Sequence, residues 1–323
     1  MPETPAASPP PTPFHDLDAY IALPRTAGLV VSPDGSRLVT AVSTLDQKRT
    51  AYVTALWEVD PTGTHPARRL TRSAKGEASP AFLPDGDLLF TSTRPDPDGA
   101  AEDDTPALLW RLPADGGEAR VVARRPGGLA GPVVARDRGT VVVASMTFPS
   151  STDEESESTI RAERKDRKVS AILHTSYPVR HWDHDLGPDA PRLFVAETDP
   201  QTSSDPATGS DTPTTSGDAD LLELRDLTPD AGAALIESAY DITADGTTVV
   251  TDWHVVERGA VRTTLVAIDV ATGDRRTIAS DENFQFAGPV ISPDGTTVAA
   301  LRSSITTPSE PPDERLVLVS IAD

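Results

Sequence analysis

A short turn-forming segment recurs along this chain at intervals of about 50 residues, and this repeat restricts the possible folds more than any other feature. The five copies are Ser32-Pro33-Asp34-Gly35, Leu83-Pro84-Asp85-Gly86, Ala135-Arg136-Asp137-Arg138-Gly139, Ala244-Asp245-Gly246 and Ser292-Pro293-Asp294-Gly295. Proline presets the turn dihedral, aspartate bonds its own backbone and glycine adopts positive φ. Each copy therefore predicts a tight turn between two antiparallel strands.

Apolar runs follow the same period. In the first unit they cover residues 29–31, 38–42 and 56–60, and a short fourth run covers 68–71. Four strands in a unit of about 50 residues are typical of one blade of a β-propeller. We therefore predict an all-β fold, a β-propeller of four-stranded blades. About five blades are present, and the propeller is expected to be incomplete because the sequence ends at Asp323, before a fourth strand of the last unit.

The spacing is irregular at one place, since Asp137 and Asp245 are 108 residues apart. A diverged blade near Gly187-Pro188-Asp189 would explain this gap, and so would an enlarged third blade. We favour enlargement, because the gap contains only one pair of candidate third and fourth strands, at 192–196 and 224–228.

Three segments are predicted to lie outside the blades. Residues 154–173 carry Glu157/Arg161 and Glu163/Arg167 at i,i+4 spacing, which predicts a helical insertion on the surface. Residues 198–220 contain no large apolar residue, so we expect a disordered loop there. The start, residues 1–13, contains six prolines and is also expected to be disordered.

Charge and composition exclude several classes of function. The net charge of −21 argues against nucleic acid and anionic membranes as partners. The chain has no cysteine, so disulfides and cysteine nucleophiles are excluded. No signal-peptide pattern or long apolar run is present, and a cytoplasmic protein is expected.

Two segments carry a resemblance to a known family. Residues 14–25 (FHDLDAYIALPR), which lead into the first turn, resemble the start of acylaminoacyl-peptidase-type members of the prolyl oligopeptidase family. Residues 172–187 (ILHTSYPVRHWDHDLG) resemble a segment in the propeller of bacterial members. The resemblance extends over nearly the whole chain, except for the proline-rich start and the 198–220 loop.

The resemblance implies that substrate access and catalysis belong to two separate domains. In that family the propeller covers an α/β-hydrolase domain with a Ser, Asp, His triad and admits peptides to it, and the hydrolase domain follows the propeller in sequence. By this resemblance we expect residues 14–323 to correspond to the propeller alone, with the catalytic α/β-hydrolase domain absent from this sequence. No serine has glycine at both −2 and +2, so no catalytic residue can be assigned.

The expected function is therefore that of the non-catalytic, substrate-gating portion of a serine peptidase. Its expected partners are the missing carboxy-terminal α/β-hydrolase domain and, in the parent enzyme, a peptide; no cofactor is expected. The repeated turns also occur in TolB-type and WD-repeat propellers. A stand-alone propeller that binds a protein or a ligand is thus the alternative.

One cluster of polar side chains is the candidate substrate-binding or domain-interface site: Arg180, His181, Trp182, Asp183 and His184. Arg180 could hold a substrate carboxylate through two hydrogen bonds. Alternatively the cluster is structural, with Trp182 packed between blades and the Asp and His side chains bonding turns. We predict no metal site, because the spacing matches no motif with a defined mechanism and the side chains of an extended segment would not converge.

Overall fold

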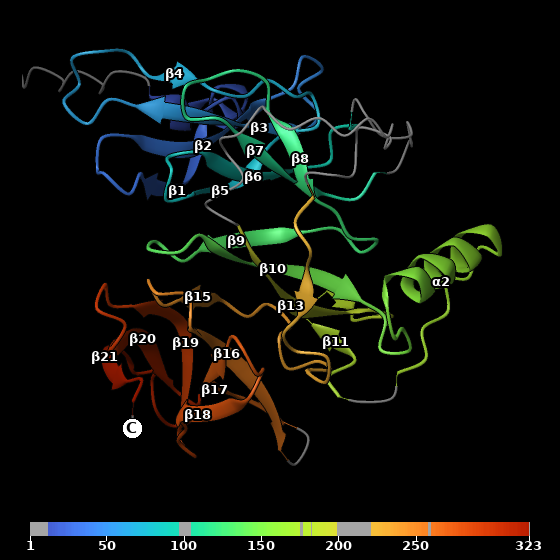
Figure 1. Ribbon diagram of the computed structural model, residues 1–323. Coiled ribbons are helices and arrows are strands. Elements are labelled where there is room, and N and C mark those ends of the chain that lie inside the picture. The colour runs from blue at the N-terminus through green and yellow to red at the C-terminus, as the bar shows by residue number, and fades with distance from the viewer. Residues whose placement is uncertain are drawn as a thin grey trace, which may run out of the picture.

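The computed structural model describes residues 12–96, 105–174, 177–181, 183–198, 221–257 and 260–322. Within these residues, five antiparallel sheets follow one another in chain order and form an incomplete β-propeller, as predicted (Figure 1). We call these sheets blades 1 to 5. Most of the predicted disordered start and loop, residues 1–11 and 199–220, lies outside the described residues.

Blades 1, 2 and 4 are built from four consecutive strands each. Their strands are β1 (Arg25–Val31), β2 (Leu38–Leu45), β3 (Tyr52–Val59) and β4 (Arg68–Arg69) in blade 1; β5 (Ala78–Phe82), β6 (Leu88–Ser92), β7 (Leu108–Leu112) and β8 (Arg120–Ala123) in blade 2; and β15 (Tyr240–Ile242), β16 (Thr248–Glu257), β17 (Ala260–Asp269) and β18 (Arg275–Ala279) in blade 4. In the described part of blade 5 the sheet has three strands, β19 (Phe284–Ile291), β20 (Thr297–Ser304) and β21 (Glu314–Ser320).

Blade 3 accounts for the irregular spacing. It consists of β9 (Ala130–Val134), β10 (Thr140–Thr147), β13 (Ala190–Glu197) and β14 (Arg225–Asp226), in the spatial order β14-β13-β10-β9. The third and fourth strands are those predicted from the sequence, so the third blade is enlarged, and the described residues of the gap form no further blade. Between β10 and β13 the chain forms helix α2 (Glu154–Asp166) and a separate two-stranded hairpin, β11 (Arg180–His181) with β12 (His184–Asp185).

The repeated turns join the first and second strand of every blade, as predicted. In blade 1 the Gly35 amide donates to the Ser32 carbonyl at 2.8 Å, and Asp34 Oδ1 accepts from Ser32 Oγ at 2.5 Å and from the Ser36 amide at 3.0 Å. These hydrogen bonds favour the charged carboxylate and lower the pKa of Asp34 to about 2. The aspartate thus forms the turn through its ionised side chain.

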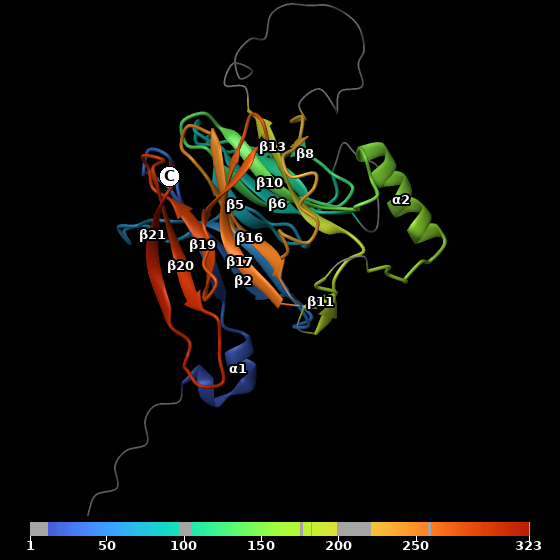
Figure 2. The same ribbon diagram turned by 90° about the horizontal axis from the view of Figure 1, so that it is seen from below.

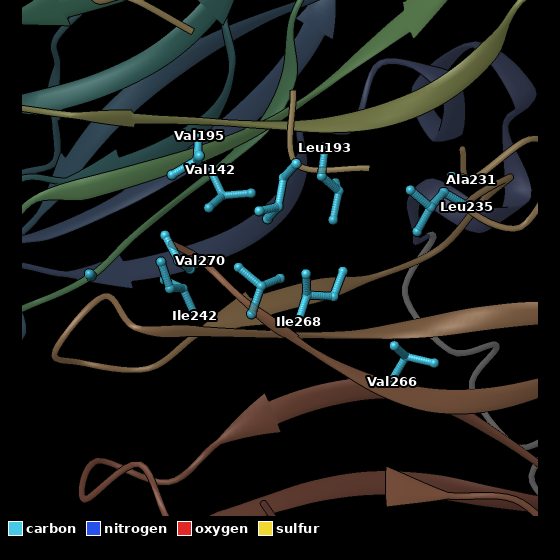
Figure 3. Packing of buried hydrophobic residues seen from close by; sticks show 12 residues of the cluster. Val142, Leu193, Val195, Ala231, Leu235, Ile242, Val266, Ile268 and Val270 are labelled. Atoms are coloured by element: carbon cyan, nitrogen blue, oxygen red, sulfur yellow. The ribbon is translucent and has the colours of Figure 1, made fainter. Parts of the chain in front are cut away.

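The hydrophobic core is divided among the boundaries between blades. Four clusters of buried side chains lie at the four junctions between consecutive blades. At the junction of blades 3 and 4, Val142, Leu193 and Val195 face Ile242 and Ile268 (Figure 3). Burial of apolar surface between neighbouring sheets is therefore what holds the blades side by side.

The described helices are few: the 3-10 turn η1 (Pro13–His15), the short helix α1 (Leu17–Ile21) and α2. None of them is long and apolar enough to cross a membrane.

Candidate functional site

The predicted site lies in the insertion of blade 3, at one end of the propeller. The Asp-containing turns join the first strand of each blade to the second, so the connections between second and third strands lie at the opposite end. This second end carries α2 and the β11–β12 hairpin. Helix α1 is held there as well, because Tyr52 Oη, at the start of β3, donates to the Ile21 carbonyl at 2.5 Å. Figure 2 shows α1 and β11 projecting from the same side of the blades.

Helix α2 is shorter than the sequence predicted. It begins at the cap Asp153, whose side chain accepts from the Ser156 amide at 2.8 Å. It ends at Asp166 with Arg167 as the C-cap, and the expected continuation to residue 173 is wrong. Lys168 has φ of 52°, a left-handed conformation that stops an α-helix.

One side of α2 is fixed to blade 3 through a buried carboxylate. The Glu157 side chain is 0% exposed, and its two oxygens accept from Arg125 Nη2 at 2.8 Å and from Arg161 Nη2 at 2.9 Å. Arg161 Nη2 also reaches Asp189 Oδ2 and the Met146 carbonyl, both at 2.8 Å. The helix predicted to lie on the surface is therefore anchored by a charged network.

Aromatic rings and a glycine complete this anchor. The guanidinium of Arg125 lies 4.0 Å from the ring centre of Phe194, and that of Arg161 lies 4.7 Å from the ring centre of Phe148. A Cβ at Gly127 would lie 1.7 Å from the Met146 carbonyl oxygen and 2.7 Å from Arg161 Nη2. Only glycine allows this close approach, so position 127 is part of the anchor.

The β11–β12 hairpin brings the predicted site residues together. Arg180 is paired with Asp185 and His181 with His184 in the antiparallel register. The Arg180 guanidinium lies 3.5 Å from Asp185 Oδ1 and donates to the Asp183 carbonyl at 3.2 Å. His184 Nδ1 lies 3.2 Å from Asp183 Oδ1. The segment is thus a hairpin and not a single extended run.

Two side chains of the hairpin are open to solvent. The side chain of Arg180 is 58% exposed and that of Asp185 is 63% exposed, so their ion pair contributes little to stability. Trp182 lies outside the described residues, and its predicted packing between blades stays a prediction. No group of three His, Cys, Asp or Glu side chains close enough to hold a metal ion occurs among the residues that the structure describes.

Sequence reasoning missed two carboxylates between blades 4 and 5, one partly buried and one buried. Asp241 accepts from the Ile291 amide at 2.8 Å, and burial raises its pKa. Asp252 is 5% exposed, its Oδ1 has no protein partner, and burial raises its pKa to about 6. An alignment of the repeats on their turns would have revealed Asp252, because the same position holds Ala41, Ala144 and Leu301 in other blades.

Comparison with known proteins supports the fold and leaves the family open. No model of a known protein family matches the sequence, and no curated protein matches it. Solved structures do match. An acylaminoacyl peptidase in complex with Z-Gly-Gly-Phe-chloromethyl ketone is similar over 94% of this chain and 40% of its own, with a TM-score of 0.56 and 11% identity.

Two further structures show the breadth of this likeness. Prolyl oligopeptidase B from Galerina marginata, bound to a 25mer macrocyclization substrate, is similar over 96% of this chain and 35% of its own, with a TM-score of 0.52 and 12% identity. An oligogalacturonate lyase in complex with manganese is similar over 91% of this chain and 65% of its own, with a TM-score of 0.50 and 16% identity. The likeness establishes the propeller fold. The chain spans less than two thirds of each of these proteins.

Proposed function

We propose that this chain is the non-catalytic, substrate-gating propeller of a prolyl oligopeptidase-like serine peptidase that acts on peptides. The observation that carries the proposal is the position of residues 172–187. This segment resembles the propellers of bacterial members of that family, and most of it lies in the exposed hairpin region at one end of the ring. A match to only 40% of an acylaminoacyl peptidase agrees with a chain that supplies one part of such an enzyme.

The same end offers a surface for a hydrolase domain. Leu173, Tyr177 and Val179 beside the hairpin are exposed, and so are Phe14 and Leu17 next to and within α1. Exposed apolar side chains of this kind are typical of surfaces that another domain covers. In this arrangement Arg180 would lie near the entrance to the enzyme, where its guanidinium could bind a peptide carboxylate in place of Asp185.

The proposal is tested by the chemistry of the chain and by the DNA that follows it. We expect no labelling of the purified protein by a fluorophosphonate probe, because the sequence has no nucleophile elbow. We also expect the DNA downstream of codon 323 to encode a G-x-S-x-G motif, in frame or after a frameshift. Strong labelling of the chain, or a stop codon followed by an unrelated gene, would contradict the proposal.

A stand-alone binding propeller is the second candidate. Two peptidases and an oligogalacturonate lyase match this chain with similar TM-scores, so the same fold occurs in proteins with unrelated chemistry. The fold by itself therefore leaves room for a propeller that only binds. An authentic stop after codon 323 would support this candidate.

A further inference from the structure

One face of blade 5 is apolar and uncovered. Strands β20 and β21 pair Leu301 with Leu316 and Ala299 with Leu318, which places these four side chains on the same face of the sheet. Leu316 is 70% exposed and Leu318 is 74% exposed. We call Ala299, Leu301, Leu316 and Leu318 the forward face of blade 5, because in the other blades the corresponding face meets the next blade.

Most of the equivalent positions of the preceding blades hold buried apolar residues. Aligned on the turns and strand pairing, eleven of the sixteen positions are apolar and buried: Val39, Ala41 and Leu56 in blade 1, Leu89 and Leu109 in blade 2, Val142, Leu193 and Val195 in blade 3, and Val250, Leu265 and Ala267 in blade 4. These eleven are at most 6% exposed, and each set belongs to the cluster that its blade shares with the next blade. The other five positions hold Glu58, Thr91, Arg111, Ala144 and Asp252. The forward face of blade 5 therefore has the composition of a blade boundary without the neighbouring blade.

Blade 1 presents the other half of such a boundary. Val31 pairs with Leu38, and Leu38 pairs with Val59, so these residues share one face, which we call the backward face of blade 1. Val31 is 53% exposed. In blades 2 and 4 the equivalent residues are buried against the preceding blade: Phe82, Leu88 and Leu112, and Ile242, Val249 and Ile268.

We propose that the forward face of blade 5 binds the backward face of blade 1 of a second copy of this chain. The two faces are the complementary halves of a boundary that the molecule already uses four times. The longer segments outside the described residues, 1–11, 97–104 and 199–220, contain no Val, Ile, Leu, Phe, Tyr or Trp, so none of them can supply an apolar cover. The proposal concerns the 323-residue chain itself and does not depend on the proposed peptidase role.

This contact is heterologous, because the two surfaces that meet are different. Each copy that binds through one face keeps its other face free, so assembly continues beyond a dimer unless the ring of copies closes. The net charge of −21 repels the copies from one another. Salt screens this repulsion, so association should strengthen as ionic strength rises.

The first measurement is the mass of the wild-type chain by light scattering or sedimentation over a range of concentrations, at low and moderate salt. We expect the mean mass to rise with concentration and with salt. A chain that remains monomeric under all these conditions would overturn the proposal.

Two variants then test the two faces one at a time. Leu316→Arg with Leu318→Arg blocks the forward face, and Val31→Arg blocks the backward face. Each variant alone should weaken association at least tenfold. Their equimolar mixture should form a dimer and stop there, because one intact forward face and one intact backward face remain in the mixture.

Leu173→Arg is the matched control, since Leu173 is 87% exposed and lies outside both faces. It should leave assembly unchanged, and circular dichroism with thermal unfolding should show all variants folded. Two outcomes contradict the proposed geometry: a mixture that stays monomeric, and a Val31→Arg variant that dimerises by itself through two forward faces. Loss of assembly in the control would assign the contact to the insertion of blade 3 instead.

Discussion

At the scale of single residues, Asp252 is a polar side chain in apolar surroundings. It lies between two sheets at a position that is apolar in blades 1, 3 and 5, and one of its carboxylate oxygens has no protein partner. Burial disfavours the charged form, which is why the pKa of Asp252 rises to about 6. The folded protein therefore binds a proton at this site more tightly than the unfolded chain does.

This difference predicts how stability depends on pH. The stabilisation linked to protonated Asp252 is fully present below about pH 4, the pKa of an unfolded aspartate, and is lost as the pH rises through about 6. Asp252→Asn should remove this loss. We expect the variant to exceed wild type by about 2–3 kcal/mol at pH 7.5 and to differ little at pH 4, measured by urea unfolding at both pH values.

The comparison needs an exposed carboxylate. Asp274→Asn removes the charge of an exposed aspartate in the same blade and is the control for the loss of one negative charge. A gain for Asp252→Asn that is independent of pH would show that packing, and not the charge of Asp252, limits stability here.

At the scale of elements, the attachment of α2 depends on a carboxylate with two arginine partners. Glu157 and Glu163 both pair with an arginine four residues later, but Glu157 is fully buried whereas the side chains of Glu163 and Arg167 are 59% and 69% exposed. The same spacing on one helix therefore provides a buried and an exposed ion pair.

Glu157→Ala should destabilise the protein by about 3–5 kcal/mol, because it removes the nearer carboxylate from the buried guanidinium of Arg125 and leaves only Glu154, whose side chain is 55% exposed, at 3.6 Å. Glu163→Ala should cost about 0.5 kcal/mol or less. Chemical denaturation of the two variants gives the comparison. Equal, small losses would mean that the Arg125–Glu157 contact does not contribute to folding.

The elements also show which parts of the fold could be predicted from the sequence. The turns, the strands and the enlargement of blade 3 were predictable, because Pro-Asp-Gly and apolar runs act over a few residues. The helix was predictable from its i,i+4 pairs, but not its buried side, since Glu157 is buried by Arg125, 32 residues earlier in the chain. Arg180, His181, Asp183 and His184 were selected from their residue types, and their role as a site stays a prediction. The hairpin that pairs Arg180 with Asp185 and His181 with His184 was not predicted, because no Asp-Gly turn marks it.

At the scale of the whole molecule, the contribution of a side chain to the free energy of unfolding depends on whether another blade covers the face on which it lies. Trp57 and Trp110 occupy equivalent positions on the third strands of blades 1 and 2, paired with Thr40 and Phe90. Trp110 is 1% exposed and faces blade 1, whereas Trp57 is only partly buried on the backward face of blade 1.

Truncation of the two tryptophans should therefore have unequal effects. Trp110→Ala should cost about 3–5 kcal/mol, as expected for a large side chain removed from a packed core. Trp57→Ala should cost less than half as much in dilute protein, where its face is open. Thermal and urea unfolding at low concentration provide the measurement, and equal losses would indicate that the face of Trp57 is covered in the monomer.

The insertion of blade 3 leaves and rejoins its sheet at neighbouring positions, because Thr147, the last residue of β10, is paired directly with Ala190, the first residue of β13. The two strands can therefore keep their pairing whatever the length of the segment between them. Removal of α2 would take away Glu157 and Glu154, the two carboxylates beside the buried guanidinium of Arg125, together with Arg161, which contacts the Met146 carbonyl and Asp189. Any replacement of this segment would therefore have to bring an acidic side chain to Arg125.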